Sequence, residues 1–213
     1  AIQFAGWIES IKEHTVDVVR YDKRAVPLTH LVYDAEAGMT DLPDLARQMK
    51  GDKHHRVGKN IYSRRQERVM RPRVDQVVGE LRRRKWLPCL YFIFSRMECE
   101  KQAAYLAKTF TFLDETQRAR VQQRFNETIP EDQRSLETVN KVMQWSLRGI
   151  GVHHAGLLPS IKEVIELLFA DGLIFVLFTT ETFAVGLNLP ARATVFNSLE
   201  KYDGMNFRYL NSK

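Results

Sequence analysis

Two apolar runs of strand length constrain the fold more than any other feature of this sequence. One is LIFVLF at residues 173–178, and the other occupies residues 89–94 within LPCLYFIFSR. Continuous apolar runs of this length are typical of strands in a parallel sheet that helices cover on both faces. Each run ends in hydroxyl-bearing residues, Ser95 after one and TTET at 179–182 after the other. The pattern predicts an α/β fold with polar groups at the carboxyl ends of its central strands, where such folds bind ligands.

Each run is coupled to a helix whose start the sequence marks. Ser160 and Glu163 have the spacing of a capping box, and Gly172 supplies the stop of that helix. Ser95 and Glu98 have the same spacing directly behind the other run. Since a strand leading into a capped helix start is a ready anion site, this pattern favours a phosphate-bearing ligand.

The charge of the chain also favours an anionic partner. Its net charge is +6 and its pI is about 9.4. The excess is concentrated from Arg47 to Lys85, where 14 Lys and Arg stand against 4 Asp and Glu. These arginines form either an RNA-facing patch or a solvated face. Those at 82–85 also suit the last turn of a helix that Val74, Val77, Val78 and Leu81 mark.

The cysteines and the hydropathy pattern indicate the compartment. Cys89 and Cys99 have no disulfide or metal-site spacing, which favours a reducing, cytoplasmic environment. No signal peptide and no run of membrane-spanning length is visible, so no membrane partner is expected.

Three further segments set the organisation of the chain. Residues 36–72 are basic and poor in apolar anchors, and they predict a loop-rich insertion in which His54 and His55 are solvated. Residues 110–150 carry two apolar stripes separated by Pro130, which predicts a helical insertion. Asp203-Gly204 predicts a C-terminal hairpin turn. Residues 16–21, VDVVRY, predict a short strand.

Two long, ungapped segments carry a family resemblance. HHAGLLP at 153–159 and TTETFAVGLNLPA at 179–191 resemble motifs of the superfamily-two DExH-box helicases, and most closely the superkiller and exosome-associated RNA helicases. Both motifs belong to the second of the family's two RecA-like lobes. The resemblance implies a three-layer, P-loop NTPase-type lobe with a mainly parallel sheet. The alternative that the residues alone leave open is a generic α/β domain with a threonine-rich loop.

The resemblance also implies domain boundaries. RAVPL at 24–28 is similar to the segment that crosses between the two lobes. Residues 1–25 are therefore expected to end the preceding lobe, and residues 26–213 to form most of the second lobe, incomplete at its C-terminus. The alternative is that residues 1–25 form a native N-terminal subdomain.

In related helicases a hairpin like that at Asp203-Gly204 wedges strands apart. The alternative role for this hairpin is that it only supports the next motif.

Site residues follow from the same motifs. Gly186 and Asn188 match positions that face ATP. The positions expected to contact the nucleic-acid backbone are Ser95, Arg96, His154, Ala155, Gly156, Thr180 and Thr182. The alternative reading of Arg96 is a plain surface residue.

The chain lacks the motifs that carry the family's chemistry. It contains no G-x-x-x-x-G-K-[ST], no DExH box and no arginine-rich Q-x-x-G-R-x-G-R before Lys213. It is therefore interpreted as a fragment of an ATP-dependent RNA helicase that binds single-stranded nucleic acid and contributes half of an interlobe ATP site.

The full-length enzyme would use ATP and Mg²⁺ together with the first RecA-like lobe in cis. The fragment alone is expected to bind neither ATP nor Mg²⁺. It is expected to be inactive, with no catalytic or metal-binding residue of its own. Two alternatives remain open, a DNA repair helicase of the same superfamily and a non-catalytic protein-docking lobe.

Overall fold

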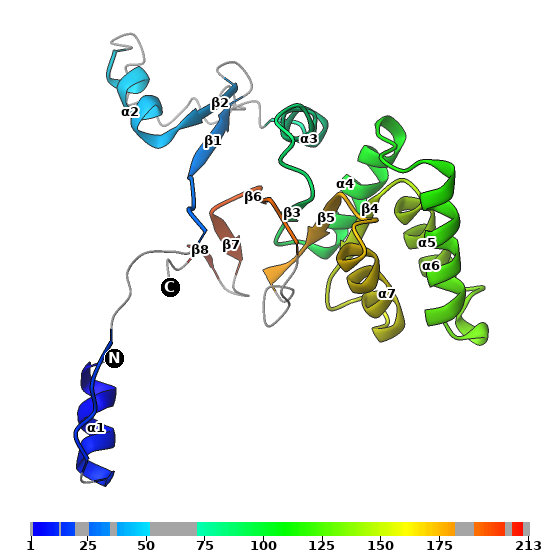
Figure 1. Cartoon of the computed structure of the whole chain (residues 1–213). Coiled ribbons are helices and arrows are strands. Elements are labelled where there is room, and N and C mark those ends of the chain that lie inside the picture. Colours follow the sequence, from blue (N-terminus) through cyan, green and yellow to red (C-terminus); the bar gives the residue numbers. More distant parts are fainter. Residues whose placement is uncertain are drawn as a thin grey trace. The chain divides into compact units, whose positions relative to one another are not determined.

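The computed structural model describes residues 2–12, 14–19, 26–34, 38–51, 72–181, 190–202 and 206–210. The chain divides into two compact units, Ala1–Tyr62 and Ser63–Lys213. The elements of each unit are labelled in Figure 1. The lobe boundary expected after residue 25 concerns the parent protein and stays a prediction.

The described residues of the first unit form two helices and a hairpin. Its elements are α1 (Ile2–Lys12), the antiparallel strands β1 (Leu31–Asp34) and β2 (Gly38–Asp41), and α2 (Leu42–Gly51). The prediction of a strand at 16–21 is wrong over its described part, because the Val16 amide donates to Glu9 Oε1 at 2.8 Å instead of joining a sheet.

Regular structure also replaces part of the loop expected at 36–72. Residues 38–51 form β2 and α2, and Asp41 Oδ1 accepts the Asp44 amide at 2.6 Å at the start of α2. Such a carboxylate satisfies a backbone donor that the first helical turn leaves without a partner. His54 and His55 lie outside the described residues.

The second unit is built around a four-stranded parallel sheet in the order β4-β5-β3-β6. The strands are β3 (Cys89–Phe92), β4 (Ile150–His153), β5 (Val176–Thr179) and β6 (Ala193–Phe196). The helices are α3 (Val74–Arg83), α4 (Arg96–Thr109), α5 (Glu115–Thr128), α6 (Glu137–Ser146) and α7 (Pro159–Ala170), with a 3₁₀ turn at Glu131–Gln133. The predicted α/β fold with a parallel sheet is thereby confirmed.

The central strand β5 is completely buried, as its continuous apolar run predicts. Both it and β3 are shorter than expected, however. Residues 173–175 lie before β5 because Gly172 adopts a φ of +71° and the Leu173 amide then bonds back to Leu168 O at 2.8 Å. The Phe175 amide bonds Gly149 O at 2.7 Å, just ahead of β4.

Helices cover the sheet closely. α4 packs against β4 and β5, and α7 packs against β4. The connections through α4 and α7 run in opposite directions across the sheet, so right-handed crossovers put the two helices on opposite faces. The approach of α7 requires Gly151 in β4, because a Cβ there would lie 2.8 Å from Leu177 Cδ1 and 3.4 Å from Ile165 Cγ2.

The observed starts of α4 and α7 show whether Ser95 and Ser160 are the predicted N-caps. Ser95 is the N-cap of α4, as predicted, and its Oγ accepts the Glu98 amide at 3.4 Å, whereas the Glu98 carboxylate accepts from Gln102 Nε2. The prediction for Ser160 is wrong, since the N-cap of α7 is Leu158 and the helix begins at Pro159. Proline is already set for the first helical position. Ser160 Oγ instead donates to Gln133 Oε1 at 2.7 Å.

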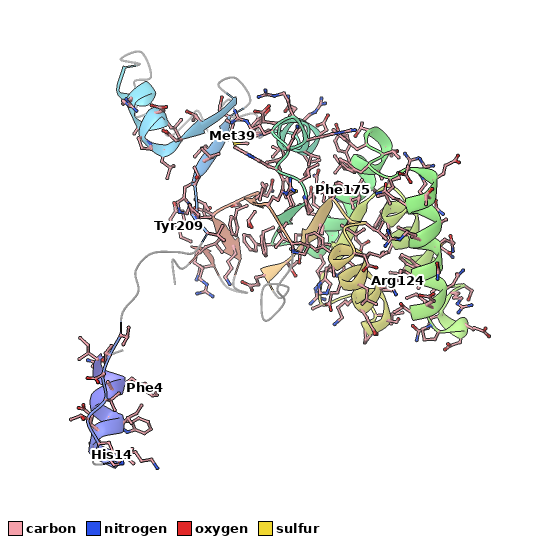
Figure 2. The ribbon with its side chains drawn as sticks, in the orientation of Figure 1. Phe4, His14, Met39, Arg124, Phe175 and Tyr209 are labelled. Carbon is pink, nitrogen blue, oxygen red and sulfur yellow. The ribbon has the colours of Figure 1, made fainter. Side chains whose placement is uncertain are left out.

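The predicted helical insertion is confirmed as α5, the 3₁₀ turn and α6. Arg124 on α5, labelled in Figure 2, donates to Asp171 Oδ2 at 3.0 Å and so ties α5 to the end of α7. After β6, strands β7 (Glu200–Tyr202) and β8 (Phe207–Tyr209) pair antiparallel, which confirms the hairpin, although Asp203-Gly204 lies outside the described residues. No described helix is long and apolar enough to cross a membrane.

Candidate nucleic-acid interface

The carboxyl ends of three neighbouring strands bring the predicted segments together. In the sheet register, Thr179 of β5 stands opposite Phe92 of β3 on one side and His153 of β4 on the other. The pairing continues past the strands, where the Ile93 amide donates to Thr179 O at 2.9 Å and the Thr180 amide to His153 O at 3.4 Å. The segments that follow the three strands therefore leave the sheet side by side.

The segment after β3 supplies a helix start. Ser95 and Arg96 are both exposed, and they stand at the N-cap and the first helical position of α4. The amino end of a helix carries a partial positive charge and unpaired backbone N–H groups, both of which favour phosphate. The exposed Arg96 side chain adds a formal positive charge at the same place.

The segment after β4 is a short turn, residues 154–156, which we call the 154–156 loop. Ala155 and Gly156 are exposed, whereas His154 is only 2% exposed. A Cβ on Gly156 would lie 3.4 Å from Arg96 Cδ, so the loop and the Arg96 side chain are close neighbours. The structure thus unites two of the predicted contact segments, although it turns the His154 imidazole inward.

Two glutamates that sequence reasoning missed hold the two histidines. His154 Nε2 is 3.1 Å from Glu100 Oε1 on α4, and His153 Nε2 is 2.8 Å from Glu166 Oε1 on α7. Burial lowers the pKa of His153, and the neighbouring Glu166 opposes part of that shift. The available signal was helical spacing, because Glu100 lies four residues after Arg96 and so shares its side of α4.

The segment after β5 begins with a buried threonine. Thr179 Oγ1 donates to His153 O at 2.9 Å and also lies 3.1 Å from Thr180 O, so this hydroxyl locks the ends of β4 and β5 together. Thr180, half-buried, is the next residue toward the loop. Thr182, Gly186 and Asn188 lie outside the described residues, and their predicted roles stay predictions.

A second basic surface lies at the opposite, amino-terminal edge of the sheet. Arg82, Lys85, Arg148 and Arg192 are exposed there, and no described carboxylate forms an ion pair with any of them. Arg82 lies 5.6 Å over the ring of Phe112, which stacks on Phe175, labelled in Figure 2. We call these four residues the amino-edge cluster. They are the alternative place at which this lobe could attract an anion.

Cys89 and Cys99 are both buried free thiols. Burial raises the pKa of both Cys89 and Cys99 to about 12, so neither is a reactive thiolate. Within the described ranges, no group of three or more His, Cys, Asp or Glu side chains is arranged to hold a metal ion.

Comparison with known proteins identifies relatives that contain a segment similar to this chain. The chain is 34% identical to exosome RNA helicase MTR4 of Mus musculus, 33% to a DExH-box ATP-dependent RNA helicase of Arabidopsis thaliana, and 32% to superkiller complex protein 2 of Homo sapiens. Over its length, the chain is homologous to one segment of these DExH-box helicases. The alignments cover 99–100% of this chain but only 22%, 24% and 19% of the relatives. No protein-family model matches this helicase segment.

Proposed function

We propose that this segment forms part of an ATP-dependent RNA helicase, in which it binds the backbone of single-stranded RNA and contributes half of an ATP site between two RecA-like lobes. The observation that carries the proposal is the convergence of Arg96, the 154–156 loop and Thr180 at one edge of the sheet. A helix start, an exposed loop, a guanidinium and a hydroxyl together suit phosphate oxygens.

The choice of RNA over DNA rests on the relatives. The three compared proteins include two that are named as RNA helicases and one from a superkiller complex. Contacts to phosphates alone carry no base information, and they read RNA and DNA alike. The relatives therefore favour the RNA helicase over the DNA repair helicase, and also over a lobe that only docks proteins.

ATP and Mg²⁺ belong to the same proposal. Gly186 and Asn188 would face the nucleotide, while the first lobe, in cis, would supply the phosphate-binding lysine and the Mg²⁺ carboxylate. When bound, the nucleotide would supply the energy for closing the lobes. The residues of this chain would hold RNA phosphates at the carboxyl edge of the sheet. A cytoplasmic location remains part of the proposal.

The test is ATP hydrolysis and strand separation by the intact helicase with matched RNA and DNA duplexes that carry single-stranded tails. We expect single-stranded RNA to stimulate hydrolysis and RNA duplexes to be separated. Binding to RNA should weaken steeply with salt, since it depends on neutralised phosphates. Equal stimulation by DNA would favour the repair helicase, and hydrolysis that ignores both nucleic acids would refute the proposal.

A further inference from the structure

We propose that Glu100 on α4 is a positioning residue for RNA binding, acting through the buried imidazole of His154 on the 154–156 loop. The inference rests on the proposed function, because it assigns a role within the same interface. The proposal adds a residue, Glu100, that contacts the loop through His154 and does not itself contact RNA.

The hydrogen bonds of His154 define its tautomer. The Gly156 amide donates to His154 Nδ1 at 3.2 Å, so Nδ1 carries no proton. The proton of the neutral ring therefore sits on Nε2, which donates to Glu100 Oε1 at 3.1 Å. The imidazole thus joins the backbone of the loop to the carboxylate on the helix. Both bonds require the same tautomer, with the proton on Nε2 and none on Nδ1.

Burial makes this arrangement depend on Glu100. The His154 side chain is 3% exposed while the Glu100 side chain is in place, so the carboxylate is the partner that fixes the Nε2 proton, and its removal frees the ring from that bond. The ring would then gain by exchanging tautomers or turning outward, and both changes break the bond from Gly156. Glu100 itself is 42% exposed, so replacing it leaves the core of the lobe intact.

The same helix carries the other contact of the interface. Arg96 and Glu100 are four residues apart on α4 and share one side of it. Arg96 Cδ would be 3.4 Å from a Cβ on Gly156, while Glu100 holds His154 two residues earlier in the loop. Glu100 therefore fixes the loop relative to the helix start, so that the exposed Ala155-Gly156 turn and the guanidinium of Arg96 can meet one phosphate backbone.

The chain offers a matched control in the neighbouring pair. His153 and Glu166 form an equally direct histidine–carboxylate contact, at 2.8 Å, but it joins β4 to α7. Glu166→Ala removes a carboxylate of the same kind without touching the bond between Gly156 and His154. If RNA binding weakens whenever a histidine loses its carboxylate partner, both Glu100→Ala and Glu166→Ala should bind RNA more weakly. If Glu100 positions the loop, only Glu100→Ala should do so.

The experiment uses the intact helicase and two measurements on each variant. Hydrogen exchange without RNA reports the Gly156 amide, and fluorescence anisotropy with a labelled single-stranded RNA reports affinity. We expect Glu100→Ala to speed exchange of the peptide that contains Gly156 and to weaken RNA binding about five- to tenfold, a loss of the size expected for one disturbed set of hydrogen bonds. Glu100→Gln should restore both values toward wild type, because its amide oxygen accepts from Nε2–H. Glu166→Ala should leave both within about twofold.

Several results would overturn the inference. They are unchanged exchange and affinity in Glu100→Ala, faster exchange with unchanged affinity, a Gln variant that behaves like the Ala variant, or an equal loss in Glu166→Ala. Failure of the wild-type protein to bind RNA would refute the proposed function instead, and the exchange measurement would still decide whether Glu100 holds the loop.

Discussion

At the scale of single residues, the interface depends on which groups face outward. Thr179 is buried, and its hydroxyl donates a hydrogen bond to His153 O, whereas Thr180, one residue later, is half-buried at the start of the loop. His154 likewise turns inward while Ala155 and Gly156 are exposed. Adjacent residues of one motif therefore divide into those that shape the edge of the sheet and those that can reach a ligand.

Thr180→Val in the intact helicase tests the role of the threonine at the start of this loop. Valine nearly preserves the shape of threonine but removes one charge-assisted hydrogen bond to phosphate, worth roughly 1.5–3 kcal/mol. RNA affinity should fall about ten- to hundredfold, with ATP affinity little changed and RNA stimulation of hydrolysis reduced. Melting temperature, nucleotide affinity and RNA affinity are measured on one preparation. A lower melting temperature with unchanged RNA affinity would show that Thr180 only caps the turn behind it.

The buried His153 gives a pH prediction. Its pKa is lowered in the folded chain, mainly by burial and further by Lys162 and His154, against the opposing effect of Glu166. The folded state therefore binds fewer protons here than the unfolded state, so stability is complete above about pH 6.5 and is lost as pH falls below it. Melting temperature should drop between pH 7 and 5, and the drop should be smaller in His153→Gln. An equal drop in both proteins would assign the effect to other groups.

At the scale of elements, helix starts are where the residue pattern and the structure disagree. The described start of α5 has a full capping box, in which Asp114 Oδ1 accepts the Gln117 amide at 2.8 Å and Gln117 Oε1 accepts the Asp114 amide at 3.0 Å. In α7, Pro159 takes the first helical position and moves Ser160 inside the helix. The same kind of sequence spacing thus has two structural outcomes.

Replacing the two polar residues by alanine tests this difference. Asp114→Ala should cost about 1 kcal/mol of the free energy of unfolding, the usual value of an N-cap. Ser160→Ala should cost less, because it removes only a side-chain bond to Gln133. Urea unfolding of both variants provides the comparison. A larger loss at Ser160 than at Asp114 would contradict the observed helix starts.

The residue pattern predicts the elements well where burial alone decides them. The apolar runs locate β3 and β5, and the helical spacing locates α3 and α7, since these segments must bury one face or both. The ends of the strands were less predictable, because Gly172 and the bond from Phe175 to Gly149 decide where β5 begins. Helical spacing places Glu100 on the same side of α4 as Arg96, but no local pattern records its contact with a histidine 54 residues away, or the contact of Glu166 with a histidine 13 residues away.

At the scale of the whole molecule, the activity should require more than this chain. The lysine and the acidic box of the family's ATP site are absent from its sequence, and the chain spans about a fifth of the relatives' length. The isolated chain should therefore show no hydrolysis of ATP, with or without RNA. Turnover that single-stranded RNA stimulates, in a sample free of contaminating enzymes, would contradict this.

The two ends of the sheet offer competing surfaces for RNA, and locating the bound strand tests the account most directly. The intact helicase is cross-linked by light to a single-stranded RNA that contains 4-thiouridine, and the modified peptides are identified by mass spectrometry. The account predicts adducts at the carboxyl edge, in peptides that contain Arg96, the 154–156 loop or Thr180. Adducts confined to the amino-edge cluster of Arg82, Lys85, Arg148 and Arg192 would contradict it.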